Sequence, residues 1–147
     1  VEEVNDDQKK IIPEKITKFF GEDLSNKTFA IWGLAFKPGT DDMREAPSIT
    51  VIGNLLQKGA RVKAFDPVAS EEAKKIFQNS VEYCKTCSSA VEGADALIIL
   101  TEWKEFRSPD FNSLKKNLRS ASIFDGRNLY DPEHLKSFGI NYFPIGR

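Results

Sequence analysis

Short apolar runs alternate along this chain with stretches of helical periodicity, and no other feature of the sequence restricts the fold as strongly. Several of these runs are apolar at consecutive positions, which is typical of strands covered by helices on both faces. Alternation of such strands with helices predicts βα units around a parallel sheet. We therefore expect an α/β fold, a Rossmann-like three-layer sandwich with a mainly parallel sheet of about six strands. The candidate strands are residues 29–32, 62–65, 81–84, 96–100, 122–124 and 141–143.

The segments between the strands carry the start and stop signals of helices. Residues 49–56 place their apolar side chains on one helical face, Pro47 suits the first turn, and Gly59 suits the end. Asp131 is expected to cap a helix over residues 132–138. Two more helices are expected over residues 71–77, with Ser70 as the cap, and over residues 111–118.

Ahead of the first strand lies a different kind of segment, in which a stripe of apolar side chains runs along residues 12–20 at helical spacing. Its lead-in is charged, and Gly21 follows it. Pro13 either begins this helix or kinks a longer one, because proline suits a first turn but disrupts the hydrogen bonds of a helix interior. We predict an N-terminal helix that leads into the sheet domain.

Length and charge exclude several classes of protein. A chain of 147 residues has the size of one domain. Its 21 basic and 22 acidic residues give a net charge of −1, without the basic excess of a nucleic-acid surface. The apolar run 96–100 is far shorter than the ~20 residues of a membrane span. Residues 1–7 are acidic where a targeting signal is basic and apolar, so we expect a cytoplasmic protein with no nucleic acid and no membrane among its partners.

The segment 33–47 follows the first predicted strand and carries two cations, Lys37 and Arg44. In an open α/β sheet, ligands bind beyond the carboxyl ends of the strands, so this loop faces the expected crevice. It lacks the G-x-G-x-x-G spacing of a dinucleotide site. Lysine and arginine are suited to bind phosphate. The alternative is that both cations only pair with neighbouring carboxylates on a solvated loop.

A second loop of this kind follows the predicted strand 122–124, where Asp125, Gly126 and Arg127 stand in succession. Two cation-bearing loops at the carboxyl ends of strands would converge on one diphosphate. The alternative is that Asp125 and Gly126 only form a turn, with Arg127 as its exposed flank.

Three motifs occur in order along the chain: GLAFKPGTDDMREAPS at 33–48, FDP at 65–67 and DGRN at 125–128. Together they resemble the C-terminal UDP-binding domain of the UDP-glucose/GDP-mannose dehydrogenase family. The resemblance extends over residues 4–147, since Asn5 and Gln8-Lys9 are similar to the end of the family's central dimer helix and 145–147 to its closing residues. It implies that residues 1–20 end the central helix and that residues 21–147 form the UDP-sugar-binding C-terminal domain.

The resemblance also implies a reaction. Similar family members oxidise the C6 alcohol of UDP-glucose to the carboxylate of UDP-glucuronate, with two NAD+ and a covalent thiohemiacetal on a cysteine. The motif around that cysteine and the NAD fingerprint belong to the family's N-terminal and central domains and are absent from this sequence. We therefore expect no catalytic residue here, an inactive isolated chain, a UDP-sugar substrate, NAD held mainly by the N-terminal domain, and a homodimer in the full-length enzyme.

Carried over residue by residue, the resemblance places Phe36 and Lys37 in the loop that contacts the substrate, with Lys37 near the diphosphate or the sugar. Arg127 matches the arginine that holds the UDP portion. Arg44 matches one that faces the NAD side of the interdomain cleft. Pro38 favours the UDP-glucose branch over the GDP-mannose branch. Two alternatives are the same domain of a UDP-N-acetylhexosamine dehydrogenase and a stand-alone nucleotide-binding or interaction module without catalysis.

Other reactive side chains are interpreted as structural. Cys84 and Cys87 form a single C-x-x-C and are expected to be reduced thiols, because zinc needs four ligands and the only histidine, His134, lies far along the chain. No metal site is expected. Asp66 either occupies the place of a ribose-binding acid or forms a turn that caps the following segment.

Overall fold

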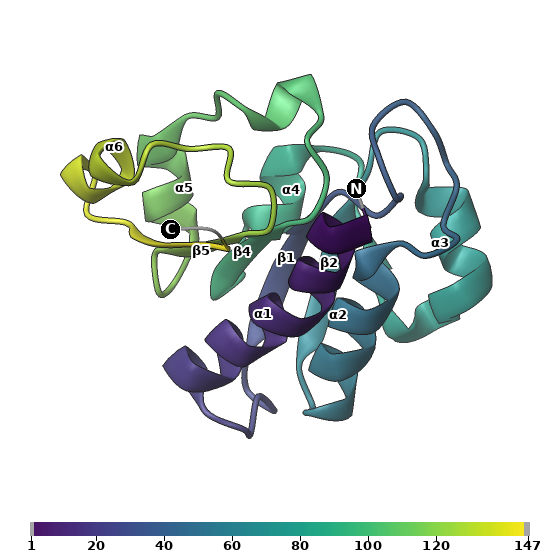
Figure 1. Cartoon of the computed structure of the whole chain (residues 1–147). Helices are drawn as coiled ribbons and strands as arrows, with labels where there is room; N and C mark the ends of the chain where they lie inside the picture. The colour runs from purple at the N-terminus through teal and green to yellow at the C-terminus, as the bar shows by residue number, and fades with distance from the viewer. Residues whose placement is uncertain (1, 146–147) are drawn as a thin grey trace.

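A six-stranded sheet forms the centre of the molecule (Figure 1). The computed structural model describes residues 2–145, with side chains from residue 9 onward, so Gly146 and Arg147 of the predicted closing motif at 145–147 lie outside the described residues. The strands follow the order β3-β2-β1-β4-β5-β6, and every pair is parallel. The predicted Rossmann-like sheet is thereby confirmed. Its strands are β1 (Thr28–Trp32), β2 (Arg61–Phe65), β3 (Glu82–Tyr83), β4 (Ala96–Ile99), β5 (Ser122–Asp125) and β6 (Asn141–Pro144).

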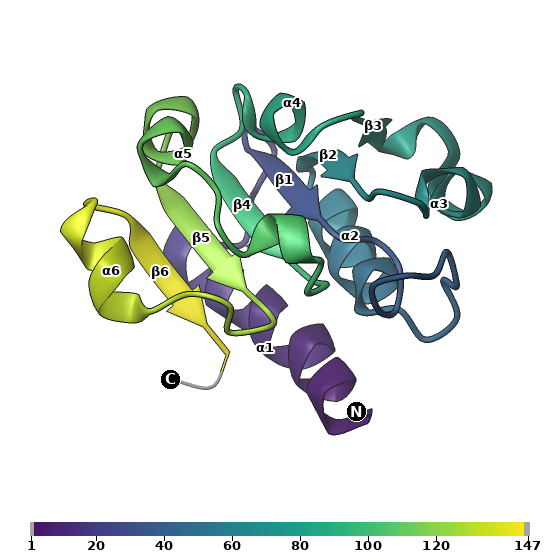
Figure 2. The same ribbon diagram turned by 90° about the horizontal axis from the view of Figure 1, so that it is seen from above.

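Each face of the sheet buries its own core, because successive side chains of a strand point to opposite faces. In β1, Phe29 and Ile31 belong to one core, and Ala30 and Trp32 belong to the other. Figure 2 shows the strands in order, with helices on both sides. The first core packs α1 (Glu2–Phe20), α2 (Pro47–Gln57) and α3 (Ser70–Phe77), and the second packs α4 (Cys87–Val91), α5 (Phe111–Asn117) and α6 (Pro132–Ser137).

The N-terminal helix α1 continues through Pro13, which decides the question left open by the sequence in favour of a longer helix. It lies beside α2 (Figure 1). Ile12 and Ile16 are fully buried against the sheet core. Burial of two such side chains stabilises the docked helix by roughly 3–6 kcal/mol, so α1 is part of the domain core.

Two details of the helices differ from the expectations. Ser70 is not the cap of α3: it lies inside the helix, and the preceding Ala69 makes no capping bond through its side chain. The helix α4 was not predicted at all; Thr86 and Ser89 hold its first turn with a reciprocal capping box. Asp131 caps α6 as expected, by accepting a hydrogen bond from the Glu133 N–H.

The topology places the carboxyl ends of β1, β4 and β5 side by side. Trp32 pairs in register with Ile99, and Ile99 pairs with Asp125. The strand order reverses between β1 and β4, and such a switch point opens a crevice at the carboxyl edge of the sheet. Among residues 2–145, no helix has the length and apolar character needed to cross a bilayer.

Candidate functional site

The loop after β1 leaves the sheet through a close contact between two backbones. Gly33 has a φ of +97°, and a Cβ there would lie 2.5 Å from the Cβ and Oγ1 atoms of Thr101, which follows β4. Only glycine fits this position without a shift of the neighbouring loop. The start of the β1 loop is therefore packed directly on the loop after β4.

Asp66, at the carboxyl end of β2, fixes the next residues of this loop. Its Oδ2 accepts the N–H groups of Leu34 and Ala35 at 2.7 and 3.1 Å. Its Oδ1 accepts the N–H groups of Val68 and Ala69, both at 2.9 Å. The turn-and-cap interpretation of Asp66 is confirmed, and the carboxylate also bridges two loops. With two donors on each oxygen and only 4% of its surface exposed, Asp66 has no capacity left for a ribose hydroxyl.

The carbonyl groups of the same loop are held as well. The Ser48 hydroxyl donates to the Leu34 carbonyl at 2.6 Å, and the Thr101 hydroxyl donates to the Ala35 carbonyl at 2.9 Å. The Phe36 N–H donates to the Asp42 carbonyl at 3.0 Å. The backbone is therefore anchored at three successive residues immediately before Lys37.

Phe36 and Lys37, the predicted substrate contacts of this loop, face different surroundings. The ring of Phe36 is half-buried against the first core. The side chain of Lys37 is exposed and, within the part of the chain that the structure describes, has no hydrogen bond or ion pair. The ion-pair alternative therefore does not describe Lys37. The charge of Lys37 acts on the Asp42 carboxylate without a hydrogen bond, so the donors of its ammonium group are available to an anion.

Arg44 follows the alternative that the sequence left open, because it pairs with Asp42. Its Nε and Nη2 donate to the two carboxylate oxygens at 3.0 and 2.9 Å. The Arg44 guanidinium and N–H hold the pKa of Asp42 down, at about 2, and the same pairing raises the pKa of Arg44. The Arg44 side chain is 89% exposed.

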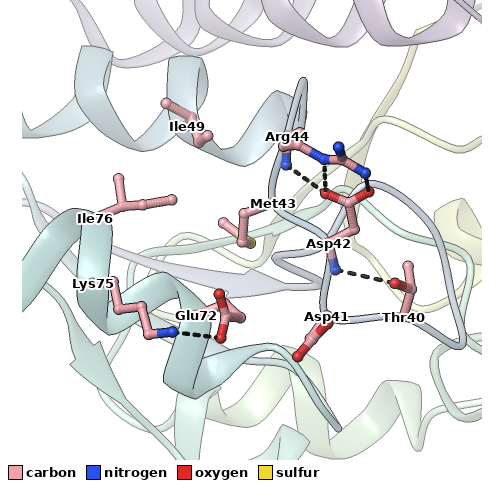
Figure 3. A pocket seen from close by; sticks show the side chains of 9 residues that line it. All are labelled: Thr40, Asp41, Asp42, Met43, Arg44, Ile49, Glu72, Lys75 and Ile76. Carbon is pink, nitrogen blue, oxygen red and sulfur yellow. Dashed lines mark hydrogen bonds and ion pairs between the residues drawn. The ribbon is translucent and has the colours of Figure 1, made fainter.

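Arg44 and Asp42 lie at the rim of a hollow of about 700 Å³ between the β1 loop, α2 and α3 (Figure 3). Met43, Ile49 and Ile76 supply apolar walls. Glu72 pairs there with Lys75. Lys37 and Arg127 do not line this hollow, although the charge of Lys37 contributes to the lowered pKa of Asp42.

The loop after β5 is organised by Asp125, which is fully buried. Its Oδ1 accepts the Arg127 N–H at 2.8 Å, and its Oδ2 accepts the Leu129 N–H and the Tyr142 hydroxyl, both at 2.7 Å. Asp125 thus forms the turn that the sequence allowed. The accompanying idea of Arg127 as an exposed flank is wrong, because its side chain is only 19% exposed.

Arg127 is held by Glu102, a residue that the sequence analysis did not single out. The Arg127 Nε donates to Glu102 Oε2 at 2.7 Å, and Nη2 of the same guanidinium contacts the same oxygen. Glu102 directly follows Thr101 in the loop after β4. A signal was present in the sequence, since Glu102 stands just beyond the carboxyl end of a predicted strand, but nothing in the spacing linked it to an arginine 25 residues later.

The predicted residues Lys37 and Arg127 thus follow strands on either side of β4. Adjacent strands lie about 4.8 Å apart, so β1 and β5 end roughly 10 Å from one another. Loops at this spacing can bind one extended anionic ligand between them. Phe36 and Lys37 belong to the loop after β1 and Arg127 to the loop after β5, whereas Arg44 lines the hollow beside α2 and α3.

The remaining reactive residues take structural positions. Burial raises the pKa of Cys84 and raises the pKa of Cys87 to about 12, so both thiols are poor nucleophiles at neutral pH. His134 is exposed and meets the rings of Phe111 and Phe138 edge-on. Among the described residues, no three His, Cys, Asp or Glu side chains are grouped so as to hold a metal ion.

Comparison with known proteins gives a consistent result. Residues 30–132 match the model of the UDP-glucose/GDP-mannose dehydrogenase family, UDP binding domain. UDP-glucose 6-dehydrogenases from Pseudomonas aeruginosa and Bacillus subtilis are 43% and 39% identical to the chain over 100% and 98% of its length. These alignments cover 34% and 32% of the two relatives, so the chain spans about a third of their length.

Solved structures agree with the sequence relatives. A UDP-glucose dehydrogenase from Pyrobaculum islandicum superposes with a TM-score of 0.77 at 28% identity, over 94% of this chain and 29% of that one. An NDP-N-acetyl-D-galactosaminuronic acid dehydrogenase from Methanosarcina mazei gives a TM-score of 0.77 at 27% identity, over 95% and 28%. Shikimate dehydrogenase from Aquifex aeolicus, at 15% identity and a TM-score of 0.64, shares the fold alone.

Proposed function

The chain belongs to the UDP-glucose/GDP-mannose dehydrogenase family, and we propose that it is the UDP-sugar-binding part of a UDP-glucose 6-dehydrogenase. The observation that carries the proposal is the pair of rigid loops on either side of β4. One presents Lys37 without a hydrogen bond or ion pair among the described residues, and the other presents Arg127 in a fixed orientation. Together they supply the positive charge that a nucleoside diphosphate needs.

In this proposal the two cations act on the diphosphate, not on the reacting carbon. Lys37 contributes a point charge, and Arg127 contributes planar N–H donors for phosphate oxygens. Phe36 shapes the wall beside them. Binding energy gained at the UDP end holds the sugar in place, so that its C6 alcohol reaches a catalytic cysteine outside this sequence. The chain itself provides orientation rather than chemistry.

The β1 loop does not fit a dinucleotide. It has no glycine-rich fingerprint, and the lone pairs of Asp66 are all engaged by backbone donors. We assign NAD+, which supplies the hydride acceptor in this reaction, mainly to a separate N-terminal domain. Arg44 is assigned to the NAD side of the interdomain cleft, and its exposure at the rim of the hollow in Figure 3 leaves it accessible from outside the domain.

The remaining parts of the proposal concern the whole enzyme. Residues 1–20 are taken as the end of a central helix, residues 21–147 as the UDP-sugar domain, and the full-length protein as a cytoplasmic homodimer that supplies UDP-glucuronate for polysaccharide synthesis. Two free thiols agree with a reducing compartment. The partners of this chain are then the UDP-sugar and the N-terminal and central domains.

Calorimetric titration of the chain tests the proposed ligand. We expect UDP and UDP-glucose to bind, GDP-mannose to bind at least tenfold more weakly, and Lys37→Ala and Arg127→Ala each to weaken UDP binding about tenfold, or about 1.4 kcal/mol. Arg119→Ala, which removes a cation just before β5, is the control and should leave the affinity unchanged. Tighter binding of UDP-N-acetylglucosamine than of UDP-glucose would redirect the proposal to a UDP-N-acetylhexosamine dehydrogenase.

Absence of UDP binding, or binding that is indifferent to both substitutions, would contradict the proposed site. A stand-alone interaction module predicts that result. The two functions are also distinguished by turnover: incubation of the purified chain with UDP-glucose and NAD+ should produce no NADH, because the sequence carries no catalytic cysteine motif. Steady NADH production would refute the proposal that catalysis requires domains outside this chain.

A further inference from the structure

We propose that Thr101 and Glu102, adjacent residues at the end of β4, form one positioning element that holds both proposed phosphate-binding loops. The inference rests on the proposed function for the identity of the ligand. Its structural content is independent of that function, because each residue contacts a different loop. β4 lies between β1 and β5, so its exit is the one place in the sheet next to both loops.

Thr101 positions the loop of Lys37. Its side chain is fully buried, its hydroxyl donates to the Ala35 carbonyl at 2.9 Å, and its Cβ occupies the space in front of Gly33. Ala35 lies two residues before Lys37. A shift of Thr101 would therefore move the backbone from which the Lys37 side chain extends.

Glu102 positions the guanidinium of Arg127. Both contacts use one carboxylate oxygen, Oε2, which accepts from Nε and from Nη2. Nη1 of Arg127 makes no hydrogen bond or ion pair within the described part of the chain. The carboxylate therefore fixes one side of the planar group and leaves donors on the other side for a phosphate.

The two side chains of this ion pair are 19% and 27% exposed, so the pair is largely withdrawn from water. Such a location strengthens the directional contact that keeps the arginine in one rotamer. It also means that Glu102 offsets part of the positive charge of Arg127. We infer that orientation outweighs this loss of charge, because the rotamer entropy of a free arginine would otherwise be lost on binding.

A double-mutant cycle with UDP as the probe tests Glu102. We expect Glu102→Ala to weaken UDP binding about fivefold, Glu102→Gln to weaken it about twofold because the amide oxygen still accepts from Nε, and Glu102→Ala to have no further effect in an Arg127→Ala background. Glu105→Ala, an exposed carboxylate of the same loop, is the matched control. Equal losses in both backgrounds, or tighter binding by Glu102→Ala, would overturn the positioning role.

Nuclear magnetic resonance of the Arg127 side chain gives a readout without ligand. We expect a sharp, slowly exchanging Nε–H signal in the wild-type chain and in Glu105→Ala, and a broadened signal in Glu102→Ala. Substitution of Thr101 by Val should speed amide exchange at Ala35 and Phe36, whose N–H groups are hydrogen-bonded, and substitution by Ser should leave the exchange at its wild-type rate. An unchanged Nε–H signal would overturn the inference even if UDP binds. If the wild-type chain does not bind UDP but the Nε–H signals behave as expected, the proposed function alone would be refuted.

Discussion

The loops after β1 and β5 both depend on a buried aspartate, and they differ in what that aspartate leaves free. Asp66 anchors the backbone ahead of Lys37, and the lysine side chain itself is unrestrained. Asp125 anchors the backbone at Arg127, and Glu102 restrains the arginine side chain in addition. A lysine is a point charge that needs only a place, whereas an arginine needs a direction as well. The difference in restraint follows the difference in chemistry.

Removal of the buried aspartates should have the largest effect on this arrangement. Asp66→Asn places an amide NH2 or a weaker acceptor against four N–H donors, and we expect it to lower the free energy of unfolding by about 3 kcal/mol. Asp125→Asn, at a carboxylate that accepts from the Arg127 and Leu129 N–H groups and the Tyr142 hydroxyl, should cost about 2 kcal/mol. Urea unfolding measures both. The control Asp41→Asn, at an exposed aspartate, should have a free energy of unfolding within about 0.5 kcal/mol of wild type. A similar loss of stability for Asp41→Asn and Asp66→Asn would show that the burial of Asp66 is unimportant.

The contact between Gly33 and Thr101 belongs only to the β1 loop, so a substitution there separates the two loops. Gly33→Ala meets Thr101 at 2.5 Å and requires a left-handed φ of +97°, and we expect a loss of at least about 2 kcal/mol in thermal or urea unfolding. Gly39→Ala has a similar φ of +81° but open space around it, and should cost about 1 kcal/mol. Equal costs would mean that the steric contact adds nothing.

Replacement of each cation by the other type, Lys37→Arg and Arg127→Lys, tests how the two loops differ. Lys37→Arg keeps a charge at an unrestrained position, and we expect UDP affinity to change by no more than about twofold. Arg127→Lys removes the planar group that contacts Glu102 and that we propose for phosphate, so affinity should fall about tenfold, or about 1.4 kcal/mol. Calorimetry at constant salt measures both. An equal change in UDP affinity for the two substitutions would show that the orientation of Arg127 matters no more than that of Lys37.

The smallest expected effect concerns the ion pair between the side chains of Asp42 and Arg44 at the surface of the β1 loop. The pKa of Asp42 is about 2 in the folded chain, below the ordinary value, because Arg44 stabilises the carboxylate. A depressed folded pKa gives a contribution that is complete above about pH 4 and is lost as the pH falls toward 2. Asp42→Asn should therefore flatten a small part of the decline in urea midpoint between pH 4 and pH 2. Identical declines would show that the pair does not contribute.

The strands were predictable because short apolar runs, some of them continuous as at 29–32 and 96–100, alternate with helical stretches, and all six were found with parallel pairing. The helix α4 was missed because five residues are too few to show helical periodicity. Ser70 was a wrong cap because the donors ahead of α3 are satisfied by Asp66, which acts from the end of the preceding strand. Local sequence spacing identifies a residue type suited to capping, but it does not reveal another acceptor that reaches the same N–H groups from a different part of the chain.

The residues of the proposed site could be predicted only where a single loop contains both the candidate residue and the sequence pattern that identifies it. Lys37 and Arg127 stand beside glycines at strand ends, and a sequence pattern can reveal this. Glu102 and Thr101 act on loops 25 and 66 residues away along the chain, and their pairing depends on the order of strands in the sheet. The alternative of Arg127 as an exposed flank failed for the same reason, because its ion pair with Glu102 depends on the strand order.

The engagement of Asp66 has a consequence for protein engineering. Rewriting the β1 loop as G-x-G-x-x-G would supply the turn for a pyrophosphate, but the acid that conventionally selects the ribose would still be bound to the backbone of that same loop. Conversion of this domain to a cofactor carrier would therefore require a new acid and a new anchor at once. Either change alone would leave a domain that is less stable or still unable to recognise the cofactor. More than one mutation therefore separates this domain from a dinucleotide-binding Rossmann domain.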